Sequence, residues 1–385
     1  MIFPLRNLHR WFYKSLRQPK YALKVLFRRS KANLFYIFAQ GKSSLPEAIT
    51  IFLTHRCNLR CKMCGQWGEL GVTGRQDTAS IHEELSWQQL NSLVEECAIF
   101  HPNITLFGGE PLLHPHCLKL IQLIKTKSMH CLIITNGSLL DEYAERLVES
   151  GLDELNVSLD GPAKLHDSIR GQEGLFDRIS QGLLKVFELK KKTGQRRPLV
   201  NLQCTITRYN YQYLEEMIKV AGELKADSLT FHNLIFMEKE RLKKQEEIDR
   251  QLGCVSKDWE GFVFESGIDP QYLYSKMKEI TSKSYPFGVD LYPNFSLKEL
   301  RQYYLSGVEN PLEKKGRCLS PWLVGYIFPD GSLRPCLNST FIFGNIKKAP
   351  LRQIWNNQEA IRFRRLLKSR RIFPVCLRCS EFYRY

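Results

Sequence analysis

The strongest constraint on the fold is an alternation of short apolar, β-branched runs with helical stretches, which starts near residue 48. The strand-like runs are residues 49–54, 104–107, 131–135, 154–159, 200–206 and 228–231. Strands that are separated by helices pair in parallel through right-handed crossovers. The sequence therefore predicts an α/β fold with six strand–helix units, and 285–293 is a candidate for one more strand.

The intervening stretches show helical periodicity, and Ser86 is a candidate N-cap for the first of them. These stretches are residues 86–100, 139–150, 175–192 and 213–224. Residues capable of chemistry stand just after several different strands, as they do in barrel enzymes. We therefore favour a partial (β/α)6 barrel, similar to a TIM barrel, over an open doubly wound sheet.

Three cysteines, Cys57, Cys61 and Cys64, follow the first predicted strand directly. This spacing can occupy three corners of a [4Fe–4S] cube, and most such cubes have four thiolate ligands. Residues 65–77 contain no fourth cysteine. One iron would then stay open for a ligand that is not protein. A zinc site is the alternative, but zinc sites usually supply four protein ligands.

Further motifs follow the later strands in a fixed order. The run 107–111 reads Phe-Gly-Gly-Glu-Pro, 135–137 reads Thr-Asn-Gly, and 158–161 reads Ser-Leu-Asp-Gly. Together with the three cysteines, these motifs resemble the radical S-adenosylmethionine superfamily over residues 49–233. The resemblance implies a [4Fe–4S] cluster with three cysteine ligands and S-adenosyl-L-methionine as cofactor.

The resemblance also implies a set of cofactor-binding residues. Glycines let the backbone approach a ligand where a Cβ would clash, and arginine suits a carboxylate because its fork makes two parallel bonds. A surface ion pair is the alternative for Arg170, and a hydroxyl bonded to backbone is the alternative for Ser158. The expected residues are Met63, Gly108, Gly109, Glu110, Pro111, Asn136, Ser158 and Arg170.

The implied activity is reductive cleavage of S-adenosylmethionine to a 5′-deoxyadenosyl radical that takes hydrogen from an organic substrate. Such an oxidoreductase or maturase needs a flavodoxin- or ferredoxin-like electron donor. The sequence does not choose between a peptide, a sugar-like molecule and a lipid or glycan precursor, and it identifies no catalytic acid or base. The contrasting hypothesis is a non-catalytic iron–sulfur electron carrier or redox sensor.

A second cysteine group lies near the end of the chain, at Cys318, Cys336, Cys376 and Cys379. Asp330-Gly331 predicts a hairpin turn that would bring the first two together, and residues 351–368 are expected to form one helix. The segment resembles the SPASM auxiliary-cluster domain. Four thiolates imply one auxiliary [4Fe–4S] cluster, with structural zinc as the alternative. The other five cysteines are expected to pack in the core.

The N-terminal region is basic and amphipathic. Residues 1–42 hold ten of the 56 Lys and Arg residues and no acidic residue, whereas the whole chain has 40 acidic residues. Apolar residues recur at helical spacing on both sides of Pro19, which predicts two helices. Packing on the main body and peripheral attachment to an anionic membrane surface both fit this pattern. Nucleic-acid binding is disfavoured because the rest of the chain is nearly balanced.

These features divide the chain into four regions. We expect a basic arm at 1–45, the core barrel at 46–236, an irregular connecting or substrate segment at 237–317, and the auxiliary-cluster domain at 318–385. No run approaches the roughly 18 apolar residues of a spanning helix, and no secretory signal is readable. A cytoplasmic enzyme, with or without contact at the inner membrane face, is the expectation.

Overall fold

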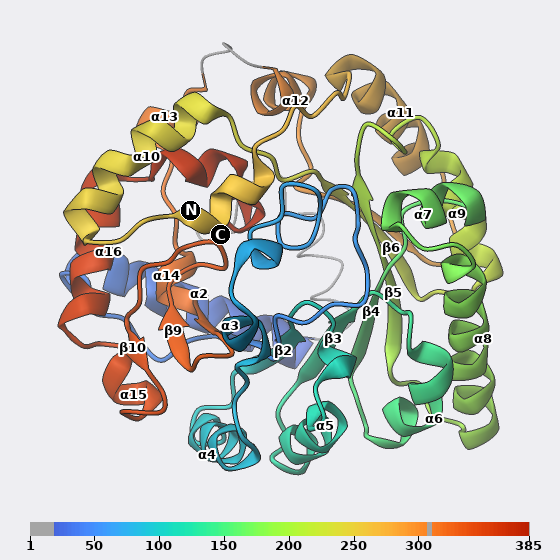
Figure 1. Cartoon of the computed structure of the whole chain (residues 1–385), viewed down its shortest axis with the longest axis horizontal. Coiled ribbons are helices and arrows are strands. Elements are labelled where there is room, and N and C mark those ends of the chain that lie inside the picture. Colours follow the sequence, from blue (N-terminus) through green and yellow to red (C-terminus); the bar gives the residue numbers. More distant parts are fainter. Residues whose placement is uncertain (1–18, 306–309, 385) are drawn as a thin grey trace.

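The computed structural model describes residues 19–305 and 310–384. Its described strands form one sheet in the order β10-β9-β8-β1-β2-β3-β4-β5-β6-β7 (Figure 1). All neighbouring pairs from β8 through β1 to β7 are parallel. The strands are β1 Ala48–Phe52, β2 Asn103–Phe107, β3 Cys131–Thr135, β4 Glu154–Ser158, β5 Leu199–Ile206, β6 Ser228–Asn233, β7 Gly288–Tyr292, β8 Val324–Ile327, β9 Ser332–Arg334 and β10 Gly344–Asn345.

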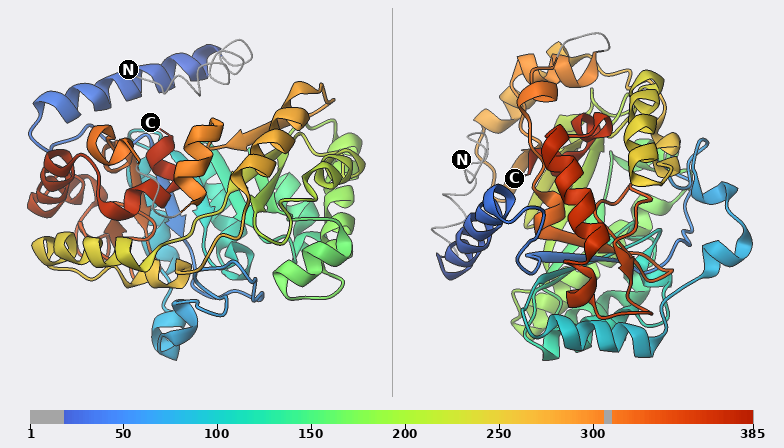
Figure 2. Two further views of the ribbon diagram at one scale, coloured as in Figure 1. Left: turned by 90° about the horizontal axis from the view of Figure 1, so that it is seen from above. Right: turned by 90° about the vertical axis from the view of Figure 1, so that its left-hand side faces the viewer.

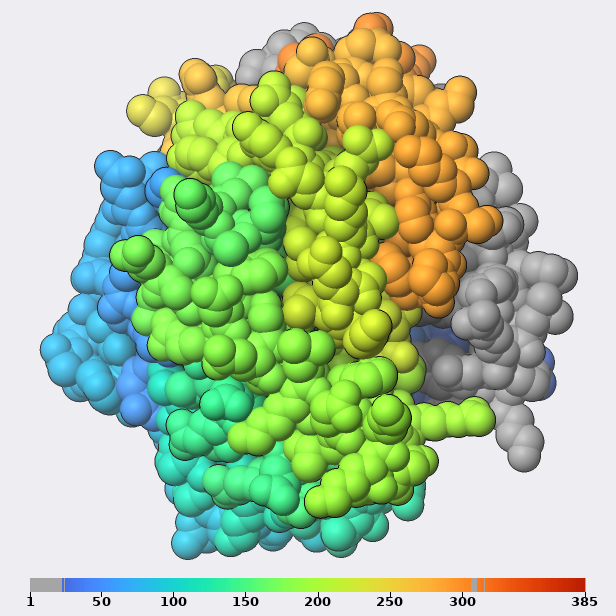
Figure 3. Space-filling view, turned by 90° about the vertical axis from the view of Figure 1, so that its right-hand side faces the viewer, coloured from blue at the N-terminus to red at the C-terminus, as the bar shows by residue number. Residues whose placement is uncertain are grey.

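The sheet curves into a partial barrel, and most helices lie outside it (Figure 1). The flank formed by residues 140–225 and 270–300 is convex (Figure 3). The six predicted strand–helix units are confirmed, and β7 adds the seventh strand. The described helices are α2 Pro19–Phe38, α3 Thr78–His82, α4 Trp87–Cys97, α5 Cys117–Thr126, α6 Leu140–Glu149, α7 Ala163–Arg170, α8 Leu175–Thr193, α9 Leu214–Glu223, α10 Lys239–Leu252, α11 Pro270–Ser282, α12 Leu297–Tyr304, α13 Leu312–Lys315, α14 Ser320–Leu323, α15 Leu351–Ile354 and α16 Gln358–Arg370.

Local sequence explains how these elements begin and how they pack. Ser86 caps α4 as predicted, because its hydroxyl accepts from the Gln89 backbone N–H while the Gln89 side chain accepts from Ser86 N–H. Along β4 and β5, buried apolar residues alternate with half-buried polar ones. The apolar side chains of these strands pack into the core. The polar side chains, which include Ser158 and Gln203, therefore lie on the opposite face of the sheet.

The C-terminal segment extends the same sheet instead of forming a separate one. Strand β8 pairs in parallel with β1, and Asp330-Gly331 turns the chain into the antiparallel β9 as predicted. The single helix expected over 351–368 is wrong. The chain forms α15 and then α16, because the side chain of Asn357 accepts from the Ala360 N–H and caps a new helix.

The N-terminal region is described from Pro19 onward, where α2 begins. The first predicted amphipathic helix lies outside the described residues. Helix α2 lies along one side of the molecule, and α3 lies on the opposite side (Figure 2). Helix α10, within the segment expected to be irregular, buries Ile248 and Leu252.

Candidate active site

The loop after β1 carries the first three cysteines, and each of their sulfurs faces at least one hydrogen-bond donor. Asn136 Nδ2 lies 3.9 Å from Cys57 Sγ, Arg170 Nη1 lies 3.8 Å from Cys61 Sγ, and the Trp67 backbone N–H lies 3.3 Å from Cys64 Sγ. Donors aimed at sulfur stabilise the thiolate form, which is the form that ligates iron.

Burial raises the pKa of the Cys57 thiol to about 11, and proximity to the other two thiols raises it further. The pKa of Cys61 is also raised by burial, while Arg170 opposes the shift. Without a metal the Cys57 and Cys61 thiols therefore stay protonated near neutral pH. A bound cluster would displace their protons and place its negative charge beside the three donors.

Arg170, the last residue of α7, is 9 % exposed, which excludes a simple surface ion pair. Its Nε and Nη2 each lie 2.6 Å from Asp160 Oδ2. The other carboxylate oxygen, Asp160 Oδ1, accepts from the Thr205 N–H at 2.9 Å. Asp160 thus ties α7 to β5 and aims the remaining Arg170 nitrogen at Cys61.

The two glycines after β2 permit a close approach between two loops. A Cβ on Gly108 would meet the Thr54 carbonyl oxygen at 2.7 Å, and a Cβ on Gly109 would meet that of Arg56 at 2.2 Å. The Gly109 N–H donates to Thr54, so this loop is held against the cysteine loop. Among the described residues, the carbonyl oxygens of Gly108 and Gly109 accept no hydrogen bond, and they are the groups that an amine would need.

Glu110 is fully buried and holds three neighbouring groups. Its Oε1 accepts from the Leu112 N–H at 3.0 Å and from the Thr135 hydroxyl at 2.8 Å, and its Oε2 accepts from the Asn136 N–H at 2.7 Å. Burial raises the pKa of this carboxyl to about 7, although the hydrogen bonds oppose the shift. Its contacts fix the loops after β2 and β3, and Pro111 begins the short buried helix that follows.

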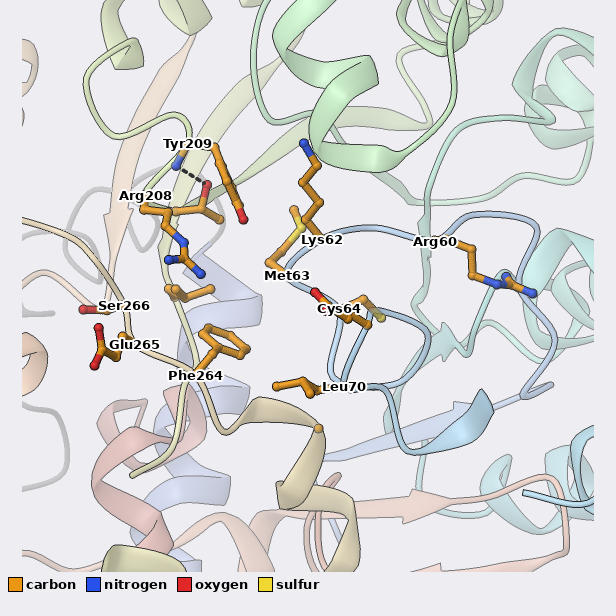
Figure 4. Close-up of a pocket in the computed structure, with 14 residues that line it drawn as sticks. Arg60, Lys62, Met63, Cys64, Leu70, Arg208, Tyr209, Phe264, Glu265 and Ser266 are labelled. Carbon is orange, nitrogen blue, oxygen red and sulfur yellow. Dashed lines mark hydrogen bonds between the residues drawn. The ribbon is translucent and has the colours of Figure 1, made fainter. Parts of the chain in front are cut away.

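The remaining predicted cofactor residues surround the same loop. Asn136 also donates to Asn58 Oδ1 at 2.9 Å, which fixes the amide that faces Cys57. Ser158 ends β4 half-buried, and its hydroxyl bonds to no described residue. Met63 and Cys64 line a cavity of about 350 Å³ beside the cysteine loop (Figure 4).

The far wall of this cavity was not part of the predicted site. It is formed by the loop after β5, the residue after β6 and the segment that follows α10. Arg208 and Glu265 line it, and neither forms an ion pair with a described residue. For Arg208, its position just after the fifth strand was the available signal. The wall residues are Thr207, Arg208, Tyr209, Leu234, Gly261, Phe264, Glu265 and Ser266.

The four C-terminal thiols also come together. Burial raises the pKa of Cys376 to about 11 and that of Cys379 to about 12, and it raises the pKa values of Cys318 and Cys336 well above the usual range. The other three thiols raise the Cys336 pKa further, so all four lie within electrostatic reach of one another. The predicted convergence of this group is therefore present.

Zinc and an iron–sulfur cube place different demands on their thiolate ligands. In residues 19–305 and 310–384, no group of three or more His, Cys, Asp or Glu side chains is arranged to hold one metal ion. A zinc ion needs its thiolates about 2.3 Å from a common point, whereas a cube offers a separate iron to each.

Tyr303 connects the C-terminal thiols to the cavity. Its hydroxyl lies 2.9 Å from the Leu234 carbonyl oxygen and 3.2 Å from that of Arg378, which stands between Cys376 and Cys379. Leu234 lines the cavity. The auxiliary site and the cavity wall are thus joined through one fully buried side chain.

Comparison with known proteins agrees with this geometry. The sequence profile of the Radical SAM superfamily matches residues 51–221, and that of the SPASM iron–sulfur cluster-binding domain matches residues 318–380. Together they span more than half of the chain. The chain belongs to the radical SAM superfamily. Its fold class, its membership and its enzymatic character are as the sequence predicted, and the family uses [4Fe–4S] clusters and S-adenosylmethionine.

Two curated relatives are from Methanosarcina barkeri. An Fe-coproporphyrin III synthase is 27 % identical over 79 % of this chain and 72 % of its own length. An AdoMet-dependent heme synthase is 25 % identical over 83 % of this chain and 85 % of its own length. Among solved structures, Streptococcus suis SuiB bound to S-adenosylmethionine has a TM-score of 0.60 and 16 % identity, over 88 % of this chain and 72 % of SuiB. That likeness supports the fold alone.

The described part of this radical SAM enzyme contains no helix with both the length and the apolar character needed to cross a bilayer. All twelve cysteines are free thiols, and four of the five outside the two groups are buried, as expected. The residues around the cysteine loop fit the family's cofactors, because they supply three donor-supported thiols, open glycine carbonyls and an adjoining cavity.

Proposed function

We propose that this enzyme generates a 5′-deoxyadenosyl radical beside the cysteine loop and uses it to abstract hydrogen from an organic substrate in the adjoining cavity. The single observation that carries the proposal is the position of Cys64 and Met63 on the wall of the 350 Å³ cavity. When bound, the cluster and S-adenosylmethionine supply the electron and the carbon–sulfur bond that is cleaved.

The residues of the chain would hold and orient these groups. We propose that Cys57, Cys61 and Cys64 ligate the cluster, and that Asn136 and Arg170 support the thiolates through the contacts described above. The Gly108 and Gly109 carbonyls are placed to accept from the cofactor's amine. Ser158 offers a free hydroxyl, and Met63 an apolar contact for adenine. Glu110 and Pro111 would act by fixing the loop.

The substrate contacts are proposed for the cavity's far wall. Arg208 and Glu265 present opposite charges without described ion-pair partners, and Tyr209 adds an aromatic face. Such a wall suits a substrate that carries polar or charged groups, whether it is a peptide, a sugar-like molecule or a lipid or glycan precursor. By their names, the two Methanosarcina relatives make tetrapyrroles, and SuiB binds a precursor peptide.

The test is anaerobic reconstitution followed by incubation with dithionite and S-adenosylmethionine. We expect 5′-deoxyadenosine, and we expect the wild-type signal to rise when a true substrate is added. A protein that carries its clusters but forms no 5′-deoxyadenosine would be the electron carrier or redox sensor that we disfavour.

Two interactions with other molecules complete the proposal. The family needs a reductant, and we propose a flavodoxin- or ferredoxin-like donor. We also propose a cytoplasmic location with peripheral contact at an anionic membrane surface, supported by the ten basic and no acidic residues of 1–42. One auxiliary [4Fe–4S] cluster on Cys318, Cys336, Cys376 and Cys379 is proposed from the convergence of these four thiols.

A further inference from the structure

Helix α2 has two faces with opposite roles. Val25 and Ala32 are buried, at 8 % and 0 % exposure, and they lie on one side of the helix at helical spacing. The opposite side carries large apolar side chains that remain in solvent: Leu23 (65 % exposed), Phe27 (69 %), Leu34 (56 %), Ile37 (50 %) and Phe38 (74 %). We call these five residues the outer stripe.

The inner face of α2 is fastened to the body by polar contacts. Arg28 Nη2 donates to the carbonyl oxygens of Phe100 and His101 at 2.7 and 3.1 Å, and Arg29 Nε lies 3.7 Å from Glu47 Oε2. Near the helix end, Tyr36 packs edge-on against Trp322 with ring centroids 5.0 Å apart. The helix therefore has a fixed orientation, and the outer stripe cannot turn inward without breaking these contacts.

The outer stripe is an unusual surface for a soluble protein, because exposed apolar residues normally occur singly. A stripe along a 20-residue helix of about 30 Å is long enough to make extended contact with a flat surface. The helix contains Lys20, Lys24 and Lys31 besides its two anchoring arginines, and it contains no acidic residue. An apolar stripe on a helix whose charged residues are all basic matches an anionic lipid interface better than a protein groove of mixed charge.

We infer that the outer stripe is the surface by which this enzyme lies on an anionic bilayer, with α2 in the plane of the interface. This specifies the membrane contact proposed above and is independent of the radical chemistry. The sequence left open whether the basic N-terminal region packs on the main body or binds an anionic membrane. In this proposal α2 does both, because its inner face packs on the body and its outer face contacts lipid.

The inference also sets the orientation of the enzyme. Arg28 contacts the residues just before β2, so α2 lies at the amino ends of the strands, whereas the cysteine loop follows the carboxyl end of β1. Figure 2 shows α2 and α3 on opposite sides of the molecule. A protein resting on α2 would therefore turn its cavity away from the bilayer, toward soluble substrates and electron donors.

The test is co-sedimentation of the full-length protein with vesicles of phosphatidylcholine that contain a minor fraction of phosphatidylglycerol. The key variant combines Phe27→Ser, Leu34→Ser and Phe38→Ser. The matched control combines Tyr213→Ser, Leu184→Ser and Val255→Ser, which are 45 %, 42 % and 59 % exposed elsewhere on the surface. Wild type and control should pellet alike, and the stripe variant should bind about tenfold or more weakly, since binding scales with buried apolar area.

Charge gives a second arm of the experiment. Replacing Lys20, Lys24 and Lys31 by Gln, raising the salt concentration or using phosphatidylcholine alone should each weaken binding. Absence of wild-type binding overturns the proposal together with the membrane contact. Equal binding by wild type and the stripe variant overturns the choice of surface. A dimer in the ultracentrifuge that the stripe substitutions abolish, without vesicle binding, would assign the stripe to a second copy of the chain instead. In each case 5′-deoxyadenosine formation reports separately on the proposed activity.

Discussion

The two cysteine groups of this enzyme differ in construction. The first lies within eight residues of one loop. Its Cys64 borders a cavity, and each of its three thiols faces a hydrogen-bond donor. The second gathers its thiols from three segments spread over more than 60 residues and places them in a buried, aromatic region. We therefore expect loss of the first group to stop chemistry with little structural damage, and loss of the second to damage the fold as well.

The largest effect is expected at the first group. Cys57→Ala, Cys61→Ala or Cys64→Ala should each abolish 5′-deoxyadenosine formation, because each proposed ligand holds one corner of the cluster. The fold should survive, with a change of about 1 kcal/mol or less for the two half-buried positions. Product chromatography and thermal unfolding measure the two quantities. Cys254→Ala, a half-buried thiol outside both groups, is the control, and undiminished product from any of the three variants would contradict the assignment.

At the second group we expect a smaller loss of S-adenosylmethionine cleavage and a larger loss of stability. Cys376→Ala and Cys379→Ala should keep some uncoupled cleavage of S-adenosylmethionine, since the two ligand sets are separate. A metal site contributes folding energy, so the unfolding temperature should fall by about 10 °C or more.

Iron per chain and calorimetry check this prediction. A well-folded double variant with unchanged iron content would show that these cysteines hold no auxiliary cluster. Zinc in the wild-type protein, with iron only for the first group, would instead favour the alternative.

Sequence patterns predicted the local features of the molecule better than its long-range contacts. The strand at Cys131–Thr135 and the Ser86 cap follow from local propensity, and both are as expected. The pairing of β8 with β1 joins segments almost 280 residues apart, which no local period encodes. The break before α16 was missed because the Asn357 cap interrupts an otherwise helical pattern.

The same limit applies to the candidate site. The cysteine spacings and the glycine motif were readable because they are contiguous in the sequence. The role of Gly108 and Gly109 in the close approach of two loops could not be predicted, because the carbonyl oxygens that they face belong to the loop after β1. Arg208 and Glu265 line one cavity only because the fold brings their segments together. The ion pair of Asp160 with Arg170 depends on the turn between β4 and α7.

Arg170→Gln should reduce catalysis less than the loss of a cluster ligand does. Removing one partner of a buried ion pair leaves Asp160 without its counter-charge, which costs about 3–5 kcal/mol. It also removes a donor from Cys61, and hydrogen bonds to cluster sulfurs tune the reduction potential. The potential of the first cluster should therefore become more negative, as measured by redox titration with electron paramagnetic resonance.

Lys62→Gln is the matched control, because Lys62 is an exposed cation on the same loop that donates to Ser168 and to no cysteine. An Arg170→Gln protein with wild-type potential and stability would show that the contact with Cys61 has no electronic role. Asp160→Asn should reproduce part of the change by releasing the guanidinium.

The smallest effect, and the most specific in its pH dependence, is expected at Glu110. Its pKa is about 7 in the folded protein, raised by burial from an ordinary value near 4.5. The folded state therefore binds more protons than the unfolded state between these values, so stability falls as pH rises from about 4.5 through 7. The change amounts to about 3 kcal/mol at most. Glu110→Gln should abolish this slope. It should also cost about 1–3 kcal/mol near pH 5, because an amide cannot accept from all three donors. Urea unfolding of the metal-free protein at several pH values tests this, and an unchanged slope in the variant would assign the pH dependence to another group.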